Sequence, residues 1–220
     1  MSSTRDSMMP PPDTPADAGP VIVRPVPAPP PPFPLPPLFG KYSFEKIEVH
    51  DPGLLPYLYL HPIYAPHSEG KLSGKPFMKS HMHVVERLAN HLMKGGKFTG
   101  KKGKALQTVR LAFDELAKRE TTNPLQLLVT AIENAAPREE VTRLQFGGIS
   151  VPRAVDSSPA RRVGVAIRNL AQGAITASHK STKSISTCLA NEIALAAKGD
   201  LTSFAVARKE EVERVAQSAR

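Results

Sequence analysis

Residues 123–167 read NPLQLLVTAIENAAPREEVTRLQFGGISVPRAVDSSPARRVGVAI, and the hydrophobic period changes twice along this stretch. Asn123-Pro124 is a typical helix start, with asparagine as N-cap and proline in the first turn. Apolar residues then recur at helical spacing until Pro137, which ends the helix. Ser158-Pro159 repeats the start signal. The stretch therefore predicts two helices with a different structure between them.

Between these helices the hydrophobic period is two residues, which is typical of strands. Gly147-Gly148 suits a tight two-residue turn. Such a turn pairs four apolar residues across the ribbon, Phe146 with Ile149 and Leu144 with Val151. A lone two-stranded ribbon is only marginally stable in water. We therefore predict a hairpin near 141–156 that projects from the body and contacts a partner, with Arg143 and Arg153 supplying charge.

Helical spacing recurs on both sides of this region. The apolar positions are Val84, Val85, Leu88 and Leu92; Leu106, Val109, Phe113 and Leu116; Val163, Ile167, Leu170 and Ala174; Ile185, Leu189 and Ile193; and Val212 and Val215. The second helix should start near Lys101 and the sixth near Ser203, while Lys198-Gly199 is a C-terminal stop. The pattern predicts a mainly α domain over 81–220, with six helices and one projecting two-stranded hairpin.

The N-terminal part of the chain has a different composition. Residues 1–40 contain 14 of the 23 prolines, so we expect an extended, polyproline-like leader. It is either a ligand for aromatic-lined grooves or a passive extension. Residues 41–80 should form an irregular arm in which Leu54–Leu60 docks on a surface. The arm's lysines, Lys71, Lys75 and Lys79, should follow phosphates.

The charge indicates a polyanionic partner. The 220 residues carry a net charge of +9, and residues 1–40 contribute −1, so the basic function lies downstream. The single cysteine, Cys188, excludes an internal disulfide and suits a reducing compartment. We find no apolar run near the roughly 18 residues of a membrane span and no signal peptide. The sequence predicts a soluble, basic, cytosolic protein.

Sites for catalysis are not supported. Gly95–Lys102 nearly matches a phosphate loop, but Lys102 replaces the Mg²⁺-binding hydroxyl residue and a helix precedes the loop. The three histidines His81, His83 and His91 have no further ligand to complete a metal set, and we expect them to face solvent or RNA. Cys188 should be a small core residue. We therefore expect no enzymatic activity, no cofactor and no metal.

Arg161-Arg162 in the first turn of the fourth helix is unusual, because a helix N-terminus disfavours cations. The same free N–H groups attract phosphate, and arginine adds bidentate contacts. The alternative is that these arginines pair with Asp156 or a nearby glutamate. Other basic residues gather at element ends and loops: Lys101, Lys102, Lys104, Arg138, Arg143, Arg153, Arg168, Lys180 and Lys183. We therefore favour a phosphate-binding surface.

These residues resemble the universal small-subunit ribosomal protein seven family, in its archaeal and eukaryotic cytosolic form (called ribosomal protein five in eukaryotes). The matching stretches are Leu38-Phe39-Gly40-Lys41, Asn123-Pro124-Leu125-Gln126, Ala131-Ile132, Pro137-Arg138-Glu139, Thr142-Arg143, Gly147-Gly148, Val155-Asp156, Ser158-Pro159, Arg161-Arg162-Val163, Ala166-Ile167, Lys198-Gly199, Glu213-Arg214-Val215-Ala216 and Ser218-Ala219-Arg220. The resemblance covers roughly residues 38–220. Three features depart from it: the Gly95–Gly103 loop is richer in glycine than the family leads us to expect, Asn169 stands where the family often has tryptophan, and the leader has no counterpart.

The resemblance implies a six-helix bundle with a projecting β-hairpin in the head of the small ribosomal subunit. It implies binding to the 3′ major domain of the small-subunit ribosomal RNA, nucleation of head assembly, and contact with neighbouring head proteins. The residues expected at ribosomal RNA are Lys101, Lys102, Lys104, Arg138, Arg161, Arg162, Arg168, Lys180 and Lys183. The residues expected beside exit-site tRNA and the mRNA path are Arg143, Gln145, Gly147, Gly148 and Arg153. The alternative function is a free RNA chaperone or translational regulator.

Overall fold

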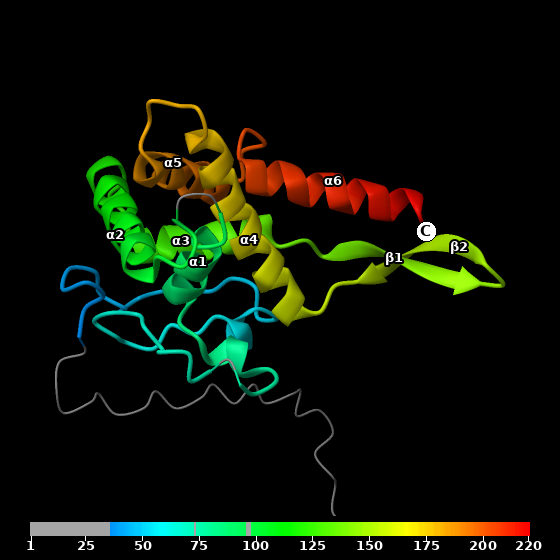
Figure 1. Ribbon diagram of the computed structural model, residues 1–220, viewed down its shortest axis with the longest axis horizontal. Coiled ribbons are helices and arrows are strands. Elements are labelled where there is room, and N and C mark those ends of the chain that lie inside the picture. The colour runs from blue at the N-terminus through cyan, green and yellow to red at the C-terminus, as the bar shows by residue number, and fades with distance from the viewer. Residues whose placement is uncertain (1–35, 73, 96–97) are drawn as a thin grey trace, which may run out of the picture. The chain divides into compact units, whose positions relative to one another are not determined.

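Helices make up most of the regular structure. The computed structural model describes residues 36–72, 74–95 and 98–220 (Figure 1). Within them the helices are α1 (Val84–Leu92), α2 (Lys102–Arg119), α3 (Pro124–Ala135), α4 (Pro159–Ser178), α5 (Ile185–Lys198) and α6 (Phe204–Ser218), and the strands are β1 (Glu139–Phe146) and β2 (Ile149–Asp156). The predicted mainly α fold with six helices and one hairpin is confirmed. The leader expected over 1–40 lies, up to residue 35, outside the described residues.

The helix ends follow the local signals of the sequence. Asn123 caps α3, because its side-chain oxygen accepts a hydrogen bond from the Leu125 N–H at 3.0 Å. Gly199 ends α5 in the left-handed conformation, with φ of 71°, which glycine adopts without a steric penalty. Ser158 occupies the N-cap position of α4 but makes no side-chain capping bond. The start and stop residues read from the sequence are therefore confirmed, although Ser158 acts through its backbone.

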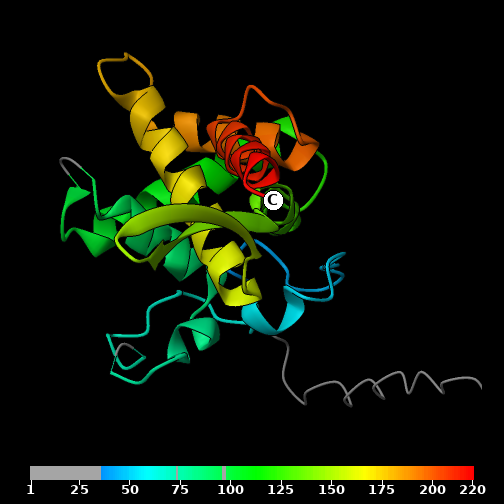
Figure 2. The same cartoon turned by 90° about the vertical axis from the view of Figure 1, so that its right-hand side faces the viewer.

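The core lies between the helices, with α5 packed against α2, α3 and α4. Figure 2 looks nearly along α6 and shows α4 crossing the molecule behind the hairpin. The apolar stripes of the sequence meet here, and the largest fully buried side chains include Leu88, Phe113, Leu128, Ile132, Ile167, Leu170 and Leu189. Burying such side chains stabilises a fold by about 1.5–3 kcal/mol each. The helical periodicity therefore identified the core positions of α1 to α5. It was wrong for α6, where Val215 is exposed and Val212 only partly buried, because the helix packs through the smaller residues Ala205, Val206 and Ala216.

The arm before α1 has little regular structure but belongs to the same core. It has two short 3₁₀ helices, Leu55–Tyr57 and Met78–His81, and only isolated β-bridges. Four of its side chains join the buried cluster, namely Leu38, Tyr42, Leu54 and Leu58. The expected docking of the Leu54–Leu60 stretch is confirmed for Leu54 and Leu58, whereas Leu55 is exposed.

Side chains of α3 supply the arm's backbone with the hydrogen bonds that a neighbouring strand would otherwise provide. Gln126 accepts a hydrogen bond from the Glu48 N–H at 2.8 Å and donates one to the Glu48 carbonyl at 2.9 Å. Glu133 accepts from the N–H groups of His50 and Asp51 at 2.7 and 3.0 Å. Backbone polar groups near a core need such partners. The arm is therefore tied to α3 by specific hydrogen bonds as well as by apolar burial.

The hairpin has the predicted register, with Phe146 opposite Ile149 and Leu144 opposite Val151. Gly147 and Gly148 have φ of 55° and 86°, as a two-residue hairpin turn with both φ values positive requires. The first strand begins at residue 139, two residues before the predicted start. The ribbon projects from the helical body (Figure 1).

Helix α6 and the chain end hold the base of this hairpin. The Ala154 N–H donates to the Ala219 carbonyl at 3.3 Å, and Arg220 forms an ion pair with Glu139. Beside them, α6 packs along β1 (Figure 1). Among the described residues, no hydrogen bond or ion pair joins residues 142–153, which lie nearer the turn, to α6 or the chain end.

The start of α6 rests on a buried carboxylate of α5. Glu192 accepts hydrogen bonds from the Ser203 hydroxyl at 2.7 Å and from the Ala205 N–H at 2.9 Å. Gly173 of α4 leaves the space for it, because a Cβ there would lie 2.8 Å from the Glu192 carboxyl carbon. Three helices thus meet at one capped helix terminus.

Candidate nucleic-acid interface

The two arginines at the start of α4 have different environments. Arg161 is exposed and its Nε donates to Glu140 at 2.6 Å. Arg162 has only 12% of its side chain exposed and donates to Asp51 of the arm at 2.8 Å. Burial raises the pKa of Asp51, but hydrogen bonds from Arg162 and Gly53 outweigh it and hold that pKa below its usual range. Arg161 is therefore available to a ligand, whereas Arg162 joins the arm to α4.

The lysines at the start of α2 divide in the same way. Lys101 and Lys104 are exposed, and the Lys104 ammonium lies 5.4 Å from the centre of the Phe98 ring. Lys102 forms an ion pair with buried Glu86 of α1. Burial raises the pKa of Glu86, but hydrogen bonds from Lys102 and Ser68 outweigh it and lower that pKa. Lys102 thus holds α1, α2 and the arm together. Residues 96–97 of the phosphate-loop near-match lie outside the described residues.

The remaining predicted basic residues lie toward the two ends of α4. Arg138 is exposed, and its carbonyl accepts from the Ser157 N–H at 2.9 Å, which places it beside the α4 start. Lys180 and Lys183 are exposed in the loop that follows α4. Twenty helical residues span about 30 Å. The structure therefore spreads the predicted residues along the length of a helix rather than gathering them in one pocket.

Arg168 and Arg161 share a groove between α4, α6 and the start of β1. Two further charged residues of α6, Arg208 and Glu211, line the same groove, and Asn169 lies half-buried in its wall. A tryptophan at position 169 would place a large apolar ring there, and asparagine leaves the groove open and polar. The groove offers hydrogen-bond donors and cations from two helices.

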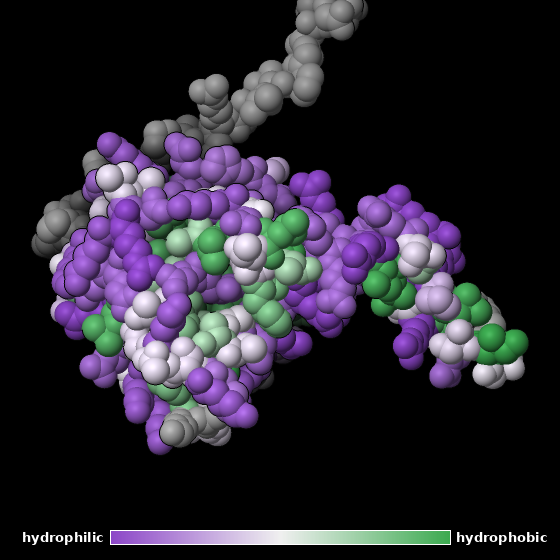
Figure 3. All heavy atoms as spheres, turned by 90° about the horizontal axis from the view of Figure 1, so that it is seen from above, coloured by the Kyte–Doolittle hydropathy of each residue, from purple (hydrophilic) through white to green (hydrophobic). Residues whose placement is uncertain are grey.

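The hairpin presents two chemically different faces. Side chains alternate along a strand, so Arg143 and Gln145 lie on one face, while Ile149, Val151 and Arg153 lie on the other. Ile149 is 70% exposed, and Figure 3 shows apolar residues exposed along a ribbon that stands clear of the helical body. The two predicted arginines therefore cannot contact one surface together. One face suits a nucleic-acid backbone and the other suits an apolar neighbour.

The expectation that all three histidines face solvent or RNA is wrong for two of them. His83 is buried at the α1 N-cap, where its Nδ1 accepts from the Val85 N–H at 3.2 Å. Burial lowers the pKa of His83 to about 4, so it is neutral at pH 7. His91 is buried on the same helix, and only His81 is exposed. The spacing of the histidines did not indicate where α1 begins or which side of it faces the arm.

One cationic cluster was missed by the sequence reading. Four basic residues line one pocket: Lys79 of the arm, Arg87 and His91 of α1, and Lys94, which follows the end of α1. Lys79 had been noted as one of the arm lysines and His91 as one of three histidines, but they were not connected with each other. Arg87 and Lys94 are dispersed among apolar helical positions, and nothing in their spacing distinguishes them from a solvated helix face.

The described residues contain no group of three His, Cys, Asp or Glu side chains placed to hold a metal ion. Cys188 is buried in α5, as expected for a core residue. None of the helices described here has the length and apolar character to cross a membrane. The interface chemistry available is that of exposed cations, hydrogen-bond donors and the two faces of a projecting ribbon.

Comparisons with known proteins agree with this chemistry. Residues 61–220 match the sequence profile of the family described as Ribosomal protein S7p/S5e. A relative from Thermoplasma volcanium, named small ribosomal subunit protein uS7, is 55% identical over 183 residues, covering 83% of this chain and 100% of the relative. Proteins of the same name from Archaeoglobus fulgidus and Methanococcus aeolicus are 52% and 49% identical, each over 83% of this chain and 94% and 98% of their own lengths.

Proposed function

The chain belongs to the ribosomal protein S7p/S5e family, and from this premise we propose that it is a structural constituent of the small ribosomal subunit. In this proposal it binds the 3′ major domain of the ribosomal RNA, nucleates assembly of the subunit head and works in the cytoplasm. It has no catalytic role. The observation that carries the proposal is the set of exposed cations along α4 and at the start of α2. These cations belong to a chain whose sequence is about half identical to proteins named for the small subunit.

The exposed cations suit phosphate recognition. We assign the main phosphate contacts to Lys101, Lys104, Arg138, Arg161, Arg168, Lys180 and Lys183, which are exposed. Each contact to an RNA phosphate releases counterions, so affinity falls with salt in proportion to the number of contacts. Lys102 and Arg162 contribute mainly by holding the surface in place, because their side chains are only 20% and 12% exposed and pair with carboxylates of the fold. Arg161 also pairs with a carboxylate, but 64% of its side chain stays exposed.

The hairpin is assigned to the working ribosome. In our proposal its polar face, with Arg143 and Gln145, lies beside exit-site tRNA and the mRNA path, and Gly147-Gly148 forms the tip. Its apolar face, with Ile149 and Val151, meets a neighbouring head protein. The support for this division is the exposure of both faces and the firm attachment of the hairpin base to α6.

Sedimentation tests the proposal against a free RNA chaperone or translational regulator. A tagged chain should co-migrate with small subunits and stay bound through a high-salt wash. A chain that leaves the particle at moderate salt, or that sediments mainly free, contradicts a structural role.

A matched set of variants tests the surface itself. Arg161→Gln with Lys104→Gln should lower the slope of log affinity against log salt by about 0.7–0.9 per lost contact. Lys118→Gln, on an exposed position at the opposite end of α2, is the control and should leave the slope unchanged. An equal slope in all variants contradicts the assigned surface.

A further inference from the structure

A small pocket lies between the arm and α1, away from the groove described above. It holds about 250 Å³ and is lined by Phe77, Lys79, Arg87, His91 and Lys94, among others. Pockets that enclose a drug-sized ligand hold roughly 300–1,000 Å³. This pocket therefore fits a group the size of a phosphate and not a whole cofactor.

The cations of this pocket have no ion-pair partner in the part of the chain that the structure describes. No carboxylate of the described residues forms an ion pair with Lys79, Arg87 or Lys94. Arg87 is only 4% exposed; one terminal nitrogen donates to the Tyr57 carbonyl at 3.1 Å, and its buried Nε has no partner. Burial lowers the pKa of Arg87 to about 10. A buried donor without an acceptor is costly, and an anion in the pocket would supply the acceptor.

The charged groups that shift the pKa of His91 are all cationic. Burial lowers the pKa of His91 to about 4, and the charges of Lys94, Lys79, Arg168 and Arg87 lower it further. Burial also lowers the pKa of Lys79, with Arg87, Lys94 and Arg168 adding to the shift. Contributions from α1, α4 and the arm therefore converge on one positive site. Bringing an anion into it relieves repulsion that the fold otherwise maintains.

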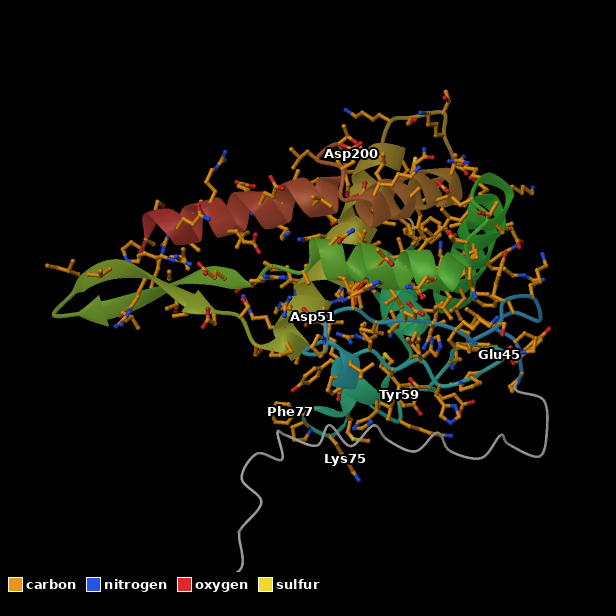
Figure 4. All side chains as sticks on the ribbon, turned by 180° about the vertical axis from the view of Figure 1, so that it is seen from behind. Glu45, Asp51, Tyr59, Lys75, Phe77 and Asp200 are labelled. Carbon is orange, nitrogen blue, oxygen red and sulfur yellow. The ribbon has the colours of Figure 1, made fainter. Side chains whose placement is uncertain are left out.

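Phe77 stands at the edge of this pocket in an unusual conformation. It is 87% exposed, and its φ of 62° lies in the left-handed region that bulky residues rarely adopt. The turn is fixed by the Ser80 hydroxyl, which donates to the Phe77 carbonyl at 2.7 Å. Figure 4 shows Phe77 and Lys75 at the edge of the arm, directed away from the helices. The backbone therefore holds an aromatic ring outside the core, next to a cationic pocket.

We propose that this pocket binds one unpaired nucleotide of RNA, with its phosphate against Lys79, Arg87 and Lys94 and its base stacked on Phe77. The inference rests on the proposed function, which makes RNA the polyanion in contact with this chain. Aromatic stacking beside phosphate-binding cations is the usual recognition of unpaired nucleotides, whereas duplex RNA offers no free base face. An apolar protein partner would bury Phe77 but would leave Lys79, Arg87 and Lys94 without an anion.

Binding of the full chain to a transcript of the 3′ major domain, measured across a salt series, separates the two parts of this site. Lys79→Gln with Lys94→Gln should lower the slope of log affinity against log salt by about one to two units. Phe77→Ala should lower affinity about 5- to 150-fold and leave the slope unchanged, because stacking releases no counterions. Lys46→Gln, an exposed lysine of the same arm that does not line the pocket, is the matched control and should change neither quantity.

The source of the anion is tested by the His91 imidazole in NMR titrations. A short single-stranded RNA should raise the pKa of His91 well above its value in the free chain, and Phe77→Ala should weaken that response. If inorganic phosphate alone gives the same shift, and Phe77→Ala does not matter, the pocket is a general anion site and the nucleotide assignment is wrong.

A photo-crosslinking side chain at position 77, in purified small subunits, distinguishes RNA from protein. Cross-linking to ribosomal RNA supports the site, and cross-linking only to a protein overturns it. Failure of the parent chain to bind ribosomal RNA would instead overturn the proposed function. Normal binding of the parent with unchanged behaviour of the pocket variants overturns the nucleotide site alone.

Discussion

The hairpin and the arm differ in how they relate regular backbone to burial. Strands β1 and β2 pair without interruption from Glu139 to Asp156, yet every residue of β2 except Ala154 is exposed. The described residues before α1 form only two short 3₁₀ helices and isolated bridges, yet they contribute four side chains to the main core. Of these two segments, the more regular is thus the less anchored, and the less regular is firmly held.

This difference follows from where each segment finds its hydrogen bonds. The hairpin pairs its own backbone groups, so it needs the body only at its base. The arm has no partner strand, so its backbone depends on Gln126 and Glu133 of α3 and its side chains depend on the core. A self-sufficient ribbon can extend toward a partner, whereas the arm forms part of the frame that positions the basic surface.

Removing one buried side chain of the arm should give the largest effect. Leu54→Ala deletes a fully buried side chain and should lower the free energy of unfolding by about 2–5 kcal/mol. Leu55→Ala, at the exposed neighbouring position, is the control and should change it by less than about 0.5 kcal/mol. Urea denaturation monitored by circular dichroism measures both. Equal effects would mean that the arm is not part of the core in solution.

Between pH 6.5 and 5, acid should lower the free energy of unfolding through the two buried histidines of the α1 region. The hairpin contains no histidine and should contribute nothing comparable in this range. Burial lowers the pKa of His83 and His91 to about 4, below the value of about 6.5 in an unfolded chain. The unfolded chain therefore binds more protons between these values, and the free energy of unfolding falls as the pH falls through this window. By pH 5 the loss should be about 1–2 kcal/mol for each histidine.

His83→Asn isolates one of these contributions, because asparagine keeps a side-chain acceptor at the N-cap and does not titrate. The pH dependence of unfolding between pH 6.5 and 5 should shrink by about half, since His91 supplies the rest. His81→Asn, at an exposed position two residues earlier, serves as the comparison. A pH dependence equal to that of the parent would show that His83 is not buried in its neutral form.

The two adjacent arginines of α4 should affect different properties, Arg162 the stability of the fold and Arg161 the binding of RNA. Arg162→Ala removes the ion pair to Asp51 and should lower the free energy of unfolding by about 1–2 kcal/mol. Arg161→Ala removes an exposed pair and should leave stability nearly unchanged while weakening RNA binding. Thermal unfolding and filter binding of both variants give the two readouts. The same profile for both arginines would contradict the division of roles.

Deleting the outer hairpin should have a small effect on stability for a change of eleven residues. Replacement of residues 143–153 by a short Gly-Ser linker should cost on the order of 1 kcal/mol, because loop entropy changes slowly with length. The attachment of Ala154 and Glu139 to the chain end is retained. Small subunits should still contain the protein, while exit-site tRNA retention and reading-frame fidelity deteriorate. Absence of the protein from those subunits would make the hairpin an assembly element.

Features encoded by neighbouring residues were predictable from the sequence. The caps at Asn123 and Gly199, the Gly147-Gly148 turn and the strand register each depend on a few adjacent residues. The periodicity of apolar residues likewise located the core face of helices α1 to α5. It failed for α6, where Val215 is half exposed and the buried residues are Ala205, Val206 and Ala216. Such signals survive without knowledge of the tertiary structure, and this is why the fold class was correct.

Features that join distant parts of the chain were not predictable in the same way. Lysine and arginine side chains near helix starts look alike in sequence, and only folding brings Asp51 to Arg162 and Glu86 to Lys102. The burial of His83 and His91 depends on where the irregular arm crosses α1, for which no periodic signal exists. The basic surface was therefore predicted as a set, and its division into engaged and available cations required the structure.

Helix α6 connects two fixed points, the buried carboxylate of Glu192 at its start and the carbonyl of Ala219 against the hairpin at its end. Fifteen helical residues span about 22 Å, so a tilt of about 5° at the first point displaces the second by about 2 Å. A displacement of that size is enough to break a hydrogen bond between the ribbon and a ligand. The orientation of the hairpin therefore depends on the protein interior, where the absence of a side chain at Gly173 gives Glu192 the space to bind the N-terminus of α6.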